Sequence, residues 1–135
     1  MTKRQAQREA QMELLFRALA DRTRLRLLNL LASGEVCVCF FVEVLGESQP
    51  KISRHLAYLR RAGVVAARRE GKWMHYRIAT PEDPHAARVF AEVMTWLGEE
   101  REMQKDRARM QTLCCAPRLP VRLQGAPRPS GLAAS

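Results

Sequence analysis

Hydrophobic residues recur along the first part of the chain at the spacing of amphipathic helices. The first such set falls at i, i+3, i+4 and i+7 and predicts one face of a helix: Met12, Leu15, Phe16 and Leu19. In the next stretch, leucines recur every three residues between Asp21, a favourable N-cap, and Gly34, which ends the pattern. These patterns predict two helices in succession.

A third and a fourth helix are predicted on either side of Gly46. Residues 35–46 are apolar enough for a short helix, although their β-branched residues leave a strand possible. Ser48 is a good N-cap, Pro50 is tolerated in a first turn, and the apolar stripe that follows ends before Gly63: Ile52, Leu56 and Leu59. Two short helices with a tight junction, the second of them basic, are typical of a helix-turn-helix.

The period changes after Gly63. Residues 64–69 and 73–78 are β-prone runs, and Glu70-Gly71 between them can form the tight turn of a hairpin. A long helix is then predicted from Pro84 to about residue 110. The expected fold class is mainly α with a small β-hairpin, a winged helix-turn-helix in which the basic hairpin is the wing.

The domain organisation follows from these elements. The 135 residues allow one domain with a modest core, which we assign to residues 1–112. Residues 113–135 are expected to form a flexible tail that carries the pair Cys114-Cys115. Four prolines in the last twenty residues, together with Gly, Ala and Arg, predict a segment that cannot bury a core.

The charge of the chain indicates the kind of partner that it binds. The chain carries a formal net charge of +9, and residues 48–77 hold eight basic side chains against a single glutamate. This distribution is typical of a protein that binds a polyanion. No apolar run is long enough to span a membrane and the amino terminus lacks the apolar core of a secretory signal, so we expect a cytoplasmic protein with no membrane partner.

The second helix of the helix-turn-helix and the wing supply the candidate DNA contacts. Gln49, Ser53 and Arg54 lie on the first two turns, where polar side chains can reach base edges in double-stranded DNA. The helix start, with Lys51, favours a phosphate. In the wing, three cations are expected to neutralise phosphates: Arg68, Arg69 and Lys72. The alternative is a solvated basic face, which the wing behind the helix disfavours.

Four cysteines supply the candidate metal chemistry. Cys37 and Cys39 form a Cys-x-Cys pair at a helix start, where the positive end of the dipole lowers a thiol pKa and two thiolates make half of a soft-metal site. The alternative is a pair of small buried hydrophobic residues. Cys114 and Cys115 could complete this site, form a second dithiol site, or act as a redox pair. His55 and His75 are expected to be structural.

No catalytic motif is present. The sequence lacks a glycine-rich phosphate loop, a Gly-x-Ser-x-Gly elbow and a His-Glu-x-x-His pair. We therefore expect neither an enzyme nor a catalytic cofactor.

Together these motifs resemble the ArsR/SmtB family of winged-helix metalloregulatory repressors, and most closely its arsenic-responsive branch. The resemblance runs from about Leu14 to Leu97 and is carried by residues 20–25, 35–39, 48–56 and 71–77. It implies a homodimer built on the first and last helices that binds an operator and is released by trivalent arsenic or antimony. It also implies that Cys37 and Cys39 are metalloid ligands.

The sequence departs from the family pattern at two places. The arsenic motif carries a third cysteine where this chain has Val42, so either a tail cysteine replaces it or two sulfurs suffice, which would favour methylarsenite. The zinc-sensing branch uses two His and two acidic residues. Here Asp83, His85 and Glu99 match that spacing but Trp96 replaces the second His, so the match indicates a remnant or a coincidence rather than a working zinc site.

Two other functions fit the same residues. One is a repressor of the same fold that senses oxidants through Cys114-Cys115. The other is an arsenic-binding chaperone or sequestering protein whose positive charge is incidental. Derepression by peroxide without metal would indicate the first, and absence of specific DNA binding the second.

Overall fold

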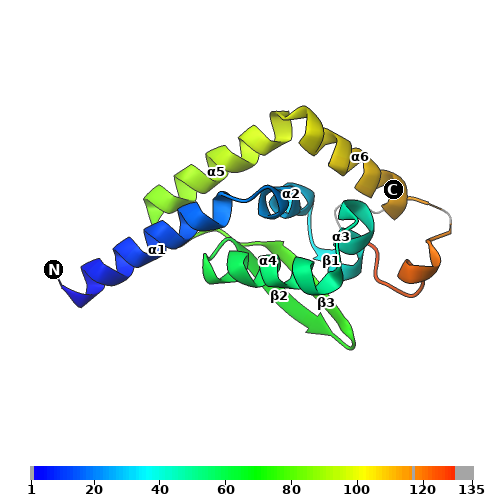
Figure 1. The fold of residues 1–135 in the computed structure, drawn as a ribbon, viewed down its shortest axis with the longest axis horizontal. Coiled ribbons are helices and arrows are strands. Elements are labelled where there is room, and N and C mark those ends of the chain that lie inside the picture. The colour runs from blue at the N-terminus through cyan, green and yellow to red at the C-terminus, as the bar shows by residue number, and fades with distance from the viewer. Residues whose placement is uncertain (1, 117, 130–135) are drawn as a thin grey trace.

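The computed structural model describes residues 2–116 and 118–129 as a helical protein with one small sheet (Figure 1). Its helices are α1 (Lys3–Leu19), α2 (Arg22–Leu31), α3 (Val38–Leu45), α4 (Gln49–Arg61), α5 (Pro84–Glu99), α6 (Arg101–Cys114) and the 3-10 turn η1 (Val121–Leu123). Its strands are β1 (Val36–Cys37), β2 (Val65–Glu70) and β3 (Trp73–Ile78), in the antiparallel order β1-β3-β2. Within these residues, no helix combines the length and apolar character needed to cross a bilayer.

The predicted helix-turn-helix is confirmed in α3 and α4. The Ser48 hydroxyl caps α4 by accepting from the backbone N–H of Lys51. Gly46 ends α3 at φ 67°, a left-handed conformation that glycine adopts without a Cβ clash, and its N–H donates to the Val42 carbonyl. The apolar stripe of α4 is fully buried, which fixes its opposite face toward solvent: Ile52, Leu56 and Leu59.

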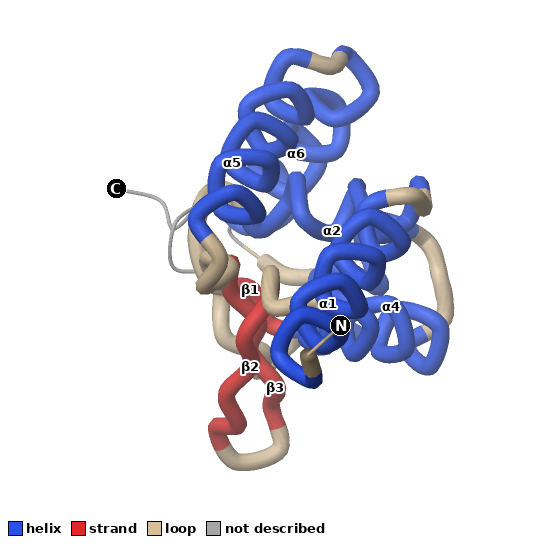
Figure 2. The backbone as a smooth tube through the Cα atoms, turned by 90° about the vertical axis from the view of Figure 1, so that its left-hand side faces the viewer, coloured by secondary structure: helices blue, strands red, loops and turns tan. Residues whose placement is uncertain are grey.

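The predicted wing is confirmed in β2 and β3, which project from the helices as a hairpin (Figure 2). Its turn is one residue later than expected, because Glu70 pairs with Trp73 and the loop is Gly71-Lys72. Gly71 has φ 58°, the region that a type II′ turn requires at its first loop position.

Residues 35–46 contain both of the structures that the sequence allowed. Val36 and Cys37 pair with Tyr76 and His75 as a third strand, and α3 follows immediately. Cys37 is the N-cap of that helix, with extended backbone (φ −72°, ψ 140°). The first cysteine therefore belongs to the sheet and the second to the helix.

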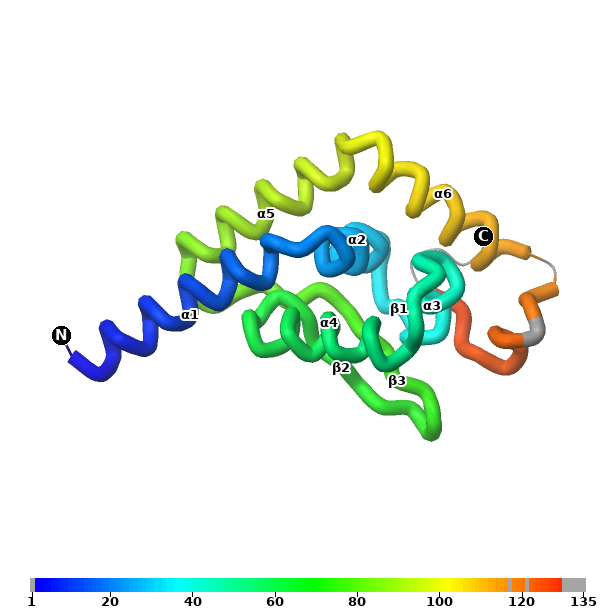
Figure 3. Tube along the Cα trace, viewed as in Figure 1, coloured from blue at the N-terminus to red at the C-terminus, as the bar shows by residue number. Residues whose placement is uncertain are grey.

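The predicted single helix from Pro84 to residue 110 is wrong. The chain bends at Glu100, whose ψ of 134° is extended, and α6 descends beyond the bend and packs against α2 and α3 (Figure 3). Gly98 weakens the helix just before the turn. The turn lets Met103 and Met110 enter the core and brings Asp106 to Arg26, with Oδ2 and Nε 2.7 Å apart.

The end of the chain also differs from the prediction of a segment without core contacts. Leu123 is 1% exposed and Ala126 6%, and η1 packs against α3. Cys114 is the last residue of α6 and is buried, its sulfur 4.0 Å from the Pro129 carbonyl oxygen, while Arg128 donates to the Cys114 carbonyl. The expected boundary between residues 112 and 113 falls inside α6. Residues 117 and 130–135 of the expected tail lie outside the described residues.

Large apolar side chains remain exposed on two helices. Met12 and Phe16 on α1 are 54% and 53% exposed, and Val89 and Trp96 on α5 are 38% and 63% exposed. The amino-terminal half of α1 extends away from the rest of the chain (Figure 1). By contrast, Leu15 and Ala18 on α1 are buried within the chain. One face of α1 thus packs in the core and a neighbouring apolar strip does not.

Candidate metal and DNA-binding sites

Cys37 and Cys39 lie where β1 passes into α3, and their sulfurs are 3.1 Å apart. Two sulfurs bound to one tetrahedral ion at about 2.3 Å are about 3.8 Å apart, so this pair can close on a single soft atom with small movements. Cys37 is 1% exposed, whereas Cys39 is partly exposed. A ligand from solvent therefore meets Cys39 first.

The two thiols differ in acidity. The hydrogen bond between the two sulfurs lowers the pKa of Cys37 to about 6. The backbone N–H groups of Cys39 and Val38 and the nearby His75 also lower this pKa, against the effect of burial. The same bond, together with burial, raises the pKa of Cys39. At neutral pH the pair is one thiolate and one thiol, and the thiolate is the form that attacks a soft metalloid centre.

The structure does not bring the four cysteines together. Across residues 2–116 and 118–129, no three His, Cys, Asp or Glu side chains are grouped so that they could hold one metal ion. Cys115 accepts from the Gln111 side-chain amide at 3.0 Å, and burial raises the pKa of the Cys114 thiol. Val42, at the position of the missing third cysteine, lies on α3 one turn beyond Cys39.

The three residues that match the zinc branch have other roles in this chain. Asp83 caps α5 by accepting from the backbone N–H groups of His85 and Ala86, and these bonds lower its pKa. His85 lies 2.7 Å from an Arg88 nitrogen. Glu99 is exposed near the other end of α5, sixteen positions after Asp83. Within the one chain they form no site.

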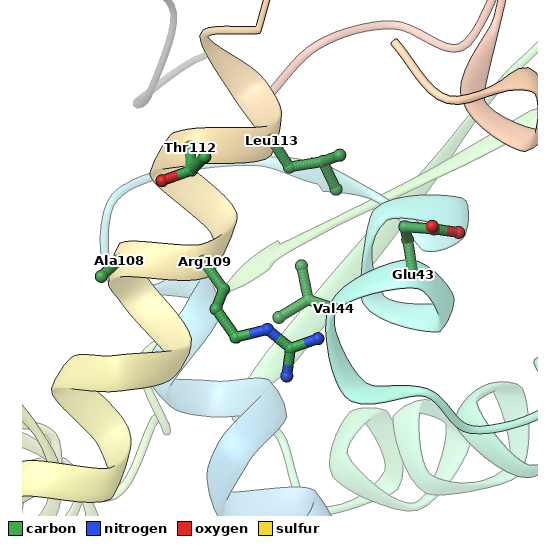
Figure 4. A pocket seen from close by; sticks show the side chains of 6 residues that line it. All are labelled: Glu43, Val44, Ala108, Arg109, Thr112 and Leu113. Atoms are coloured by element: carbon green, nitrogen blue, oxygen red, sulfur yellow. The ribbon is translucent and has the colours of Figure 1, made fainter.

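A groove of about 410 Å³ lies between α3 and α6 (Figure 4). It is lined by Glu43, Val44, Ala108, Arg109, Thr112 and Leu113. A second hollow of about 540 Å³ opens beside Gly34, Glu35 and Arg77. No cysteine lines either one. With Cys37 buried and Cys39 partly exposed, the thiol pair suits a small inorganic or methylated ligand rather than a bulky molecule.

The predicted base-reading residues lie together on the solvent side of α4. Gln49 and Arg54 are exposed, and Lys51 and Ser53 are partly exposed. Lys51 is held 3.1 Å from Glu47. Behind them, Arg24 of α2 donates to the Ala18 and Arg17 carbonyls, which ties α2 to α1. The start of α4 therefore presents polar side chains on a rigid base.

The three predicted wing cations have different surroundings. Arg69 and Lys72 are exposed near the hairpin tip, and Lys72 lies 5.0 Å from the centre of the Trp73 ring. Arg68 is instead paired with Glu35, three of its nitrogen–oxygen distances being between 2.6 and 2.9 Å. That pairing was not anticipated from the sequence, although Glu35 stands two positions before Cys37 and so shares its side of an extended strand.

Comparison with known proteins decides the family. The sequence model of a protein family described as bacterial regulatory protein, arsR family, matches residues 21–67. These residues span α2, β1, α3, α4 and the start of β2. The arsenical resistance operon repressor of Escherichia coli is 46% identical over 91 residues, a match that covers 67% of this chain and 76% of that protein. The chain belongs to the ArsR family.

Other ArsR-family proteins match over shorter stretches. An arsenic resistance transcriptional regulator of Pseudomonas putida is 53% identical over 72 residues, which is 53% of this chain and 56% of that protein. Among solved structures, a homodimeric winged helix-turn-helix DNA-binding domain from Mycobacterium bovis gives a TM-score of 0.59 at 36% identity, covering 75% of this chain and 91% of that one. The antimony-specific transcriptional repressor AntR gives a TM-score of 0.53 at 33% identity, covering 73% of this chain and 84% of the AntR chain.

Membership confirms the fold class and places the chain among regulatory proteins. ArsR-family proteins are DNA-binding transcriptional regulators, and the winged helix-turn-helix is shared with the solved relatives. The helix-turn-helix and wing of this chain are thus shared with a DNA-binding domain of known structure.

Proposed function

We propose that this ArsR-family protein is a cytoplasmic repressor that binds operator DNA as a homodimer and is released when trivalent arsenic or antimony binds Cys37 and Cys39. The observation that carries the proposal is the 3.1 Å sulfur–sulfur contact at the point where β1 enters α3. The names of the similar E. coli, P. putida and AntR proteins, which refer to arsenic or antimony, support this inducer class.

Two sulfurs set the expected preference among inducers. Methylarsenite, CH₃As(OH)₂, has two exchangeable hydroxyls; two Cys thiols displace both as water and form two As–S bonds. Arsenite, As(OH)₃, keeps one hydroxyl after the same reaction. Because Val42 replaces the third cysteine and the tail cysteines lie elsewhere in this chain, we infer that methylarsenite is the stronger inducer.

Release follows from the position of the pair. Cys37 lies in the two-residue strand β1, paired with His75, and Cys39 is in the first turn of α3. Binding both sulfurs to one atom widens their separation from 3.1 Å toward about 3.8 Å and so shifts the start of α3 relative to β1. The shift can reach α4, because residues 46–48 connect α3 to α4 and the two helices pack against each other. A dimer must place its two α4 helices about one DNA turn, roughly 34 Å, apart, so a shift of α4 lowers operator affinity. The coupling is reciprocal: operator DNA must weaken metalloid binding by the same factor.

The dimer is proposed to form through α1 and α5. These helices carry the exposed apolar side chains, whereas α6 is used inside the chain against α2 and α3. A homodimeric relative of the same fold supports the formation of a dimer.

The rival role of Cys114-Cys115 as a redox sensor is less favoured. Burial of Cys114 and its raised pKa keep it in the less reactive thiol form at neutral pH. A dithiol site there would require Cys114 to leave its place beneath Arg128 and Pro129.

The test is fluorescence anisotropy of the reduced protein on labelled DNA from upstream of its own gene. Arsenite, methylarsenite, antimonite, zinc and peroxide are titrated separately, beside a Cys114→Ser/Cys115→Ser variant as the matched control. We expect release by the trivalent metalloids, methylarsenite acting at the lowest concentration, and the same release from the variant. Release by peroxide alone that vanishes in the variant would establish the redox sensor instead. Failure of the reduced protein to bind this DNA specifically would favour the chaperone.

A further inference from the structure

One face of the sheet carries an unbroken row of functional side chains from the thiol pair to the wing. Cys37 pairs with His75 across β1 and β3, and His75 pairs with Arg68 across β3 and β2. Directly opposed residues point to the same face of a sheet, as do residues two apart on one strand. Glu35 therefore flanks Cys37 on this face, and Glu70 flanks Arg68.

Glu35 reaches across β3 and holds Arg68. The Arg68 Nε lies 2.9 Å from both carboxylate oxygens of Glu35, and one terminal nitrogen lies 2.6 Å from Oε1. His75 lies beneath this pair, 6% exposed, with its Nδ1 3.8 Å from Glu35 and its Nε2 3.3 Å from Glu70. Arg68 also lies 3.4 Å from Glu70.

This ion pair links the residue just before β1 to β2, although β1 and β2 are not hydrogen-bonded neighbours in the sheet. In the order β1-β3-β2, the strand with Cys37 and the strand with Arg68 are separated by β3. β1 is only two residues long, so few sheet bonds hold it. A half-exposed ion pair adds little to the free energy of unfolding, but a guanidinium held by both carboxylate oxygens fixes geometry. Arg68 and Glu35 form such a partly exposed pair, with side-chain exposures of 47% and 20%.

We propose that Glu35 and Arg68 form a clasp, supported by His75, that transmits the movement of Cys37 on inducer binding to the wing. They are positioning residues: Arg68 is engaged with the sensor strand, while Arg69 and Lys72 at the tip meet the DNA phosphates. When Cys37 and Cys39 bind one metalloid and their sulfurs separate to about 3.8 Å, Glu35 moves with β1 and shifts β2 and the wing tip with it. The inference rests on the proposed inducer site and adds a second route to DNA beside the one through α3 and α4.

The test measures the coupling factor, the operator Kd with methylarsenite divided by the Kd without it. It compares Glu35→Gln, Arg68→Gln and the double variant with Arg69→Gln, a matched removal of one wing cation outside the clasp. Arsenic bound per protomer after desalting and the unfolding midpoint are measured on the same samples. We expect each clasp variant to bind arsenic as the wild type does, with a coupling factor at least fivefold smaller.

The pattern across variants identifies the clasp. Because the two residues act through each other, the double variant should lose no more coupling than either single variant. Arg69→Gln should weaken DNA binding in both states and leave the factor unchanged. If the coupling factor is unchanged in Glu35→Gln and Arg68→Gln, or decreases equally in Arg69→Gln, the proposed role of the clasp is wrong. The proposed inducer site is unaffected by that result. Wild-type protein that binds methylarsenite but stays on DNA would refute the proposed function itself.

Discussion

At the scale of single residues, the thiol pair is asymmetric because each cysteine belongs to a different element. Cys37 ends a strand and is buried, whereas Cys39 lies in the first turn of a helix and is partly exposed. The short contact between them places the negative charge on Cys37. The buried member is thus the nucleophile and the exposed member is the point of entry.

The acidity of Cys37 should depend on the donor at position 39. In a Cys114→Ser/Cys115→Ser background, we expect thiolate absorbance of Cys37 to titrate with a midpoint near pH 6, because its pKa is lowered to about 6. Reaction with iodoacetamide should slow as the pH falls below this midpoint, since the thiolate becomes protonated. Cys39→Ser keeps a hydroxyl donor and should retain a low midpoint, whereas Cys39→Ala should raise it by more than one unit. A wild-type midpoint near 8.5, that of an ordinary cysteine, would exclude this assignment.

At the scale of elements, the recognition helix and the wing should contribute differently to DNA binding. Arg54→Ala in α4 should cost about 1–3 kcal/mol on the operator and little on unrelated DNA, because base edges carry the sequence information. Lys72→Ala in the wing should weaken binding to all sequences alike. It should also reduce the slope of log K against log salt by about 0.9 for each phosphate that the wing no longer neutralises. Equal decreases in affinity for operator and random DNA in Arg54→Ala would argue against base reading.

The packing of α6 against α2 makes a second element-scale prediction. Asp106 is buried and bound to Arg26 through two hydrogen bonds of 2.7 and 3.0 Å. Asp106→Ala leaves the Arg26 guanidinium partly buried without its carboxylate and should lower the free energy of unfolding by about 3 kcal/mol in urea titrations. Lys105→Ala, which removes an exposed pair with Glu102, should cost less than about 0.5 kcal/mol. Similar destabilisation in both variants would mean that α6 is not docked this way.

These elements also mark how far the sequence alone could go. Caps, glycines and apolar spacing were enough to predict α1 to α4 and the wing, because Asp21, Ser48 and Gly46 act locally. The turn at Glu100 could not be predicted this way, since it is set by contacts some eighty residues apart, such as Arg26 with Asp106. Met103 and Met110 lie seven positions apart, on the same side of a helix, and this spacing indicates the face of α6 that is buried. The Glu35–Arg68 pair depends on sheet order, which the hairpin pattern does not specify.

At the scale of the whole molecule, the exposed apolar strip on α1 should be the dimer interface together with α5. Phe16→Glu places a charge in this strip and should convert the dimer to a monomer in sedimentation velocity, with operator affinity falling by more than tenfold. Gln7→Glu adds the same charge on the opposite side of α1 and should leave the dimer intact. If Phe16→Glu forms dimers as stable as those of the wild type, the interface lies elsewhere on the molecule.

Induction joins these residues and elements in one proposed series of events: a metalloid binds both Cys37 and Cys39, α3 and the wing shift, and the operator is released. The most direct measurement is operator anisotropy of Cys37→Ser during a methylarsenite titration, beside the wild type. We predict unchanged operator affinity for the variant without inducer and no release at concentrations that free the wild type completely. Normal release of Cys37→Ser would contradict the proposed mechanism.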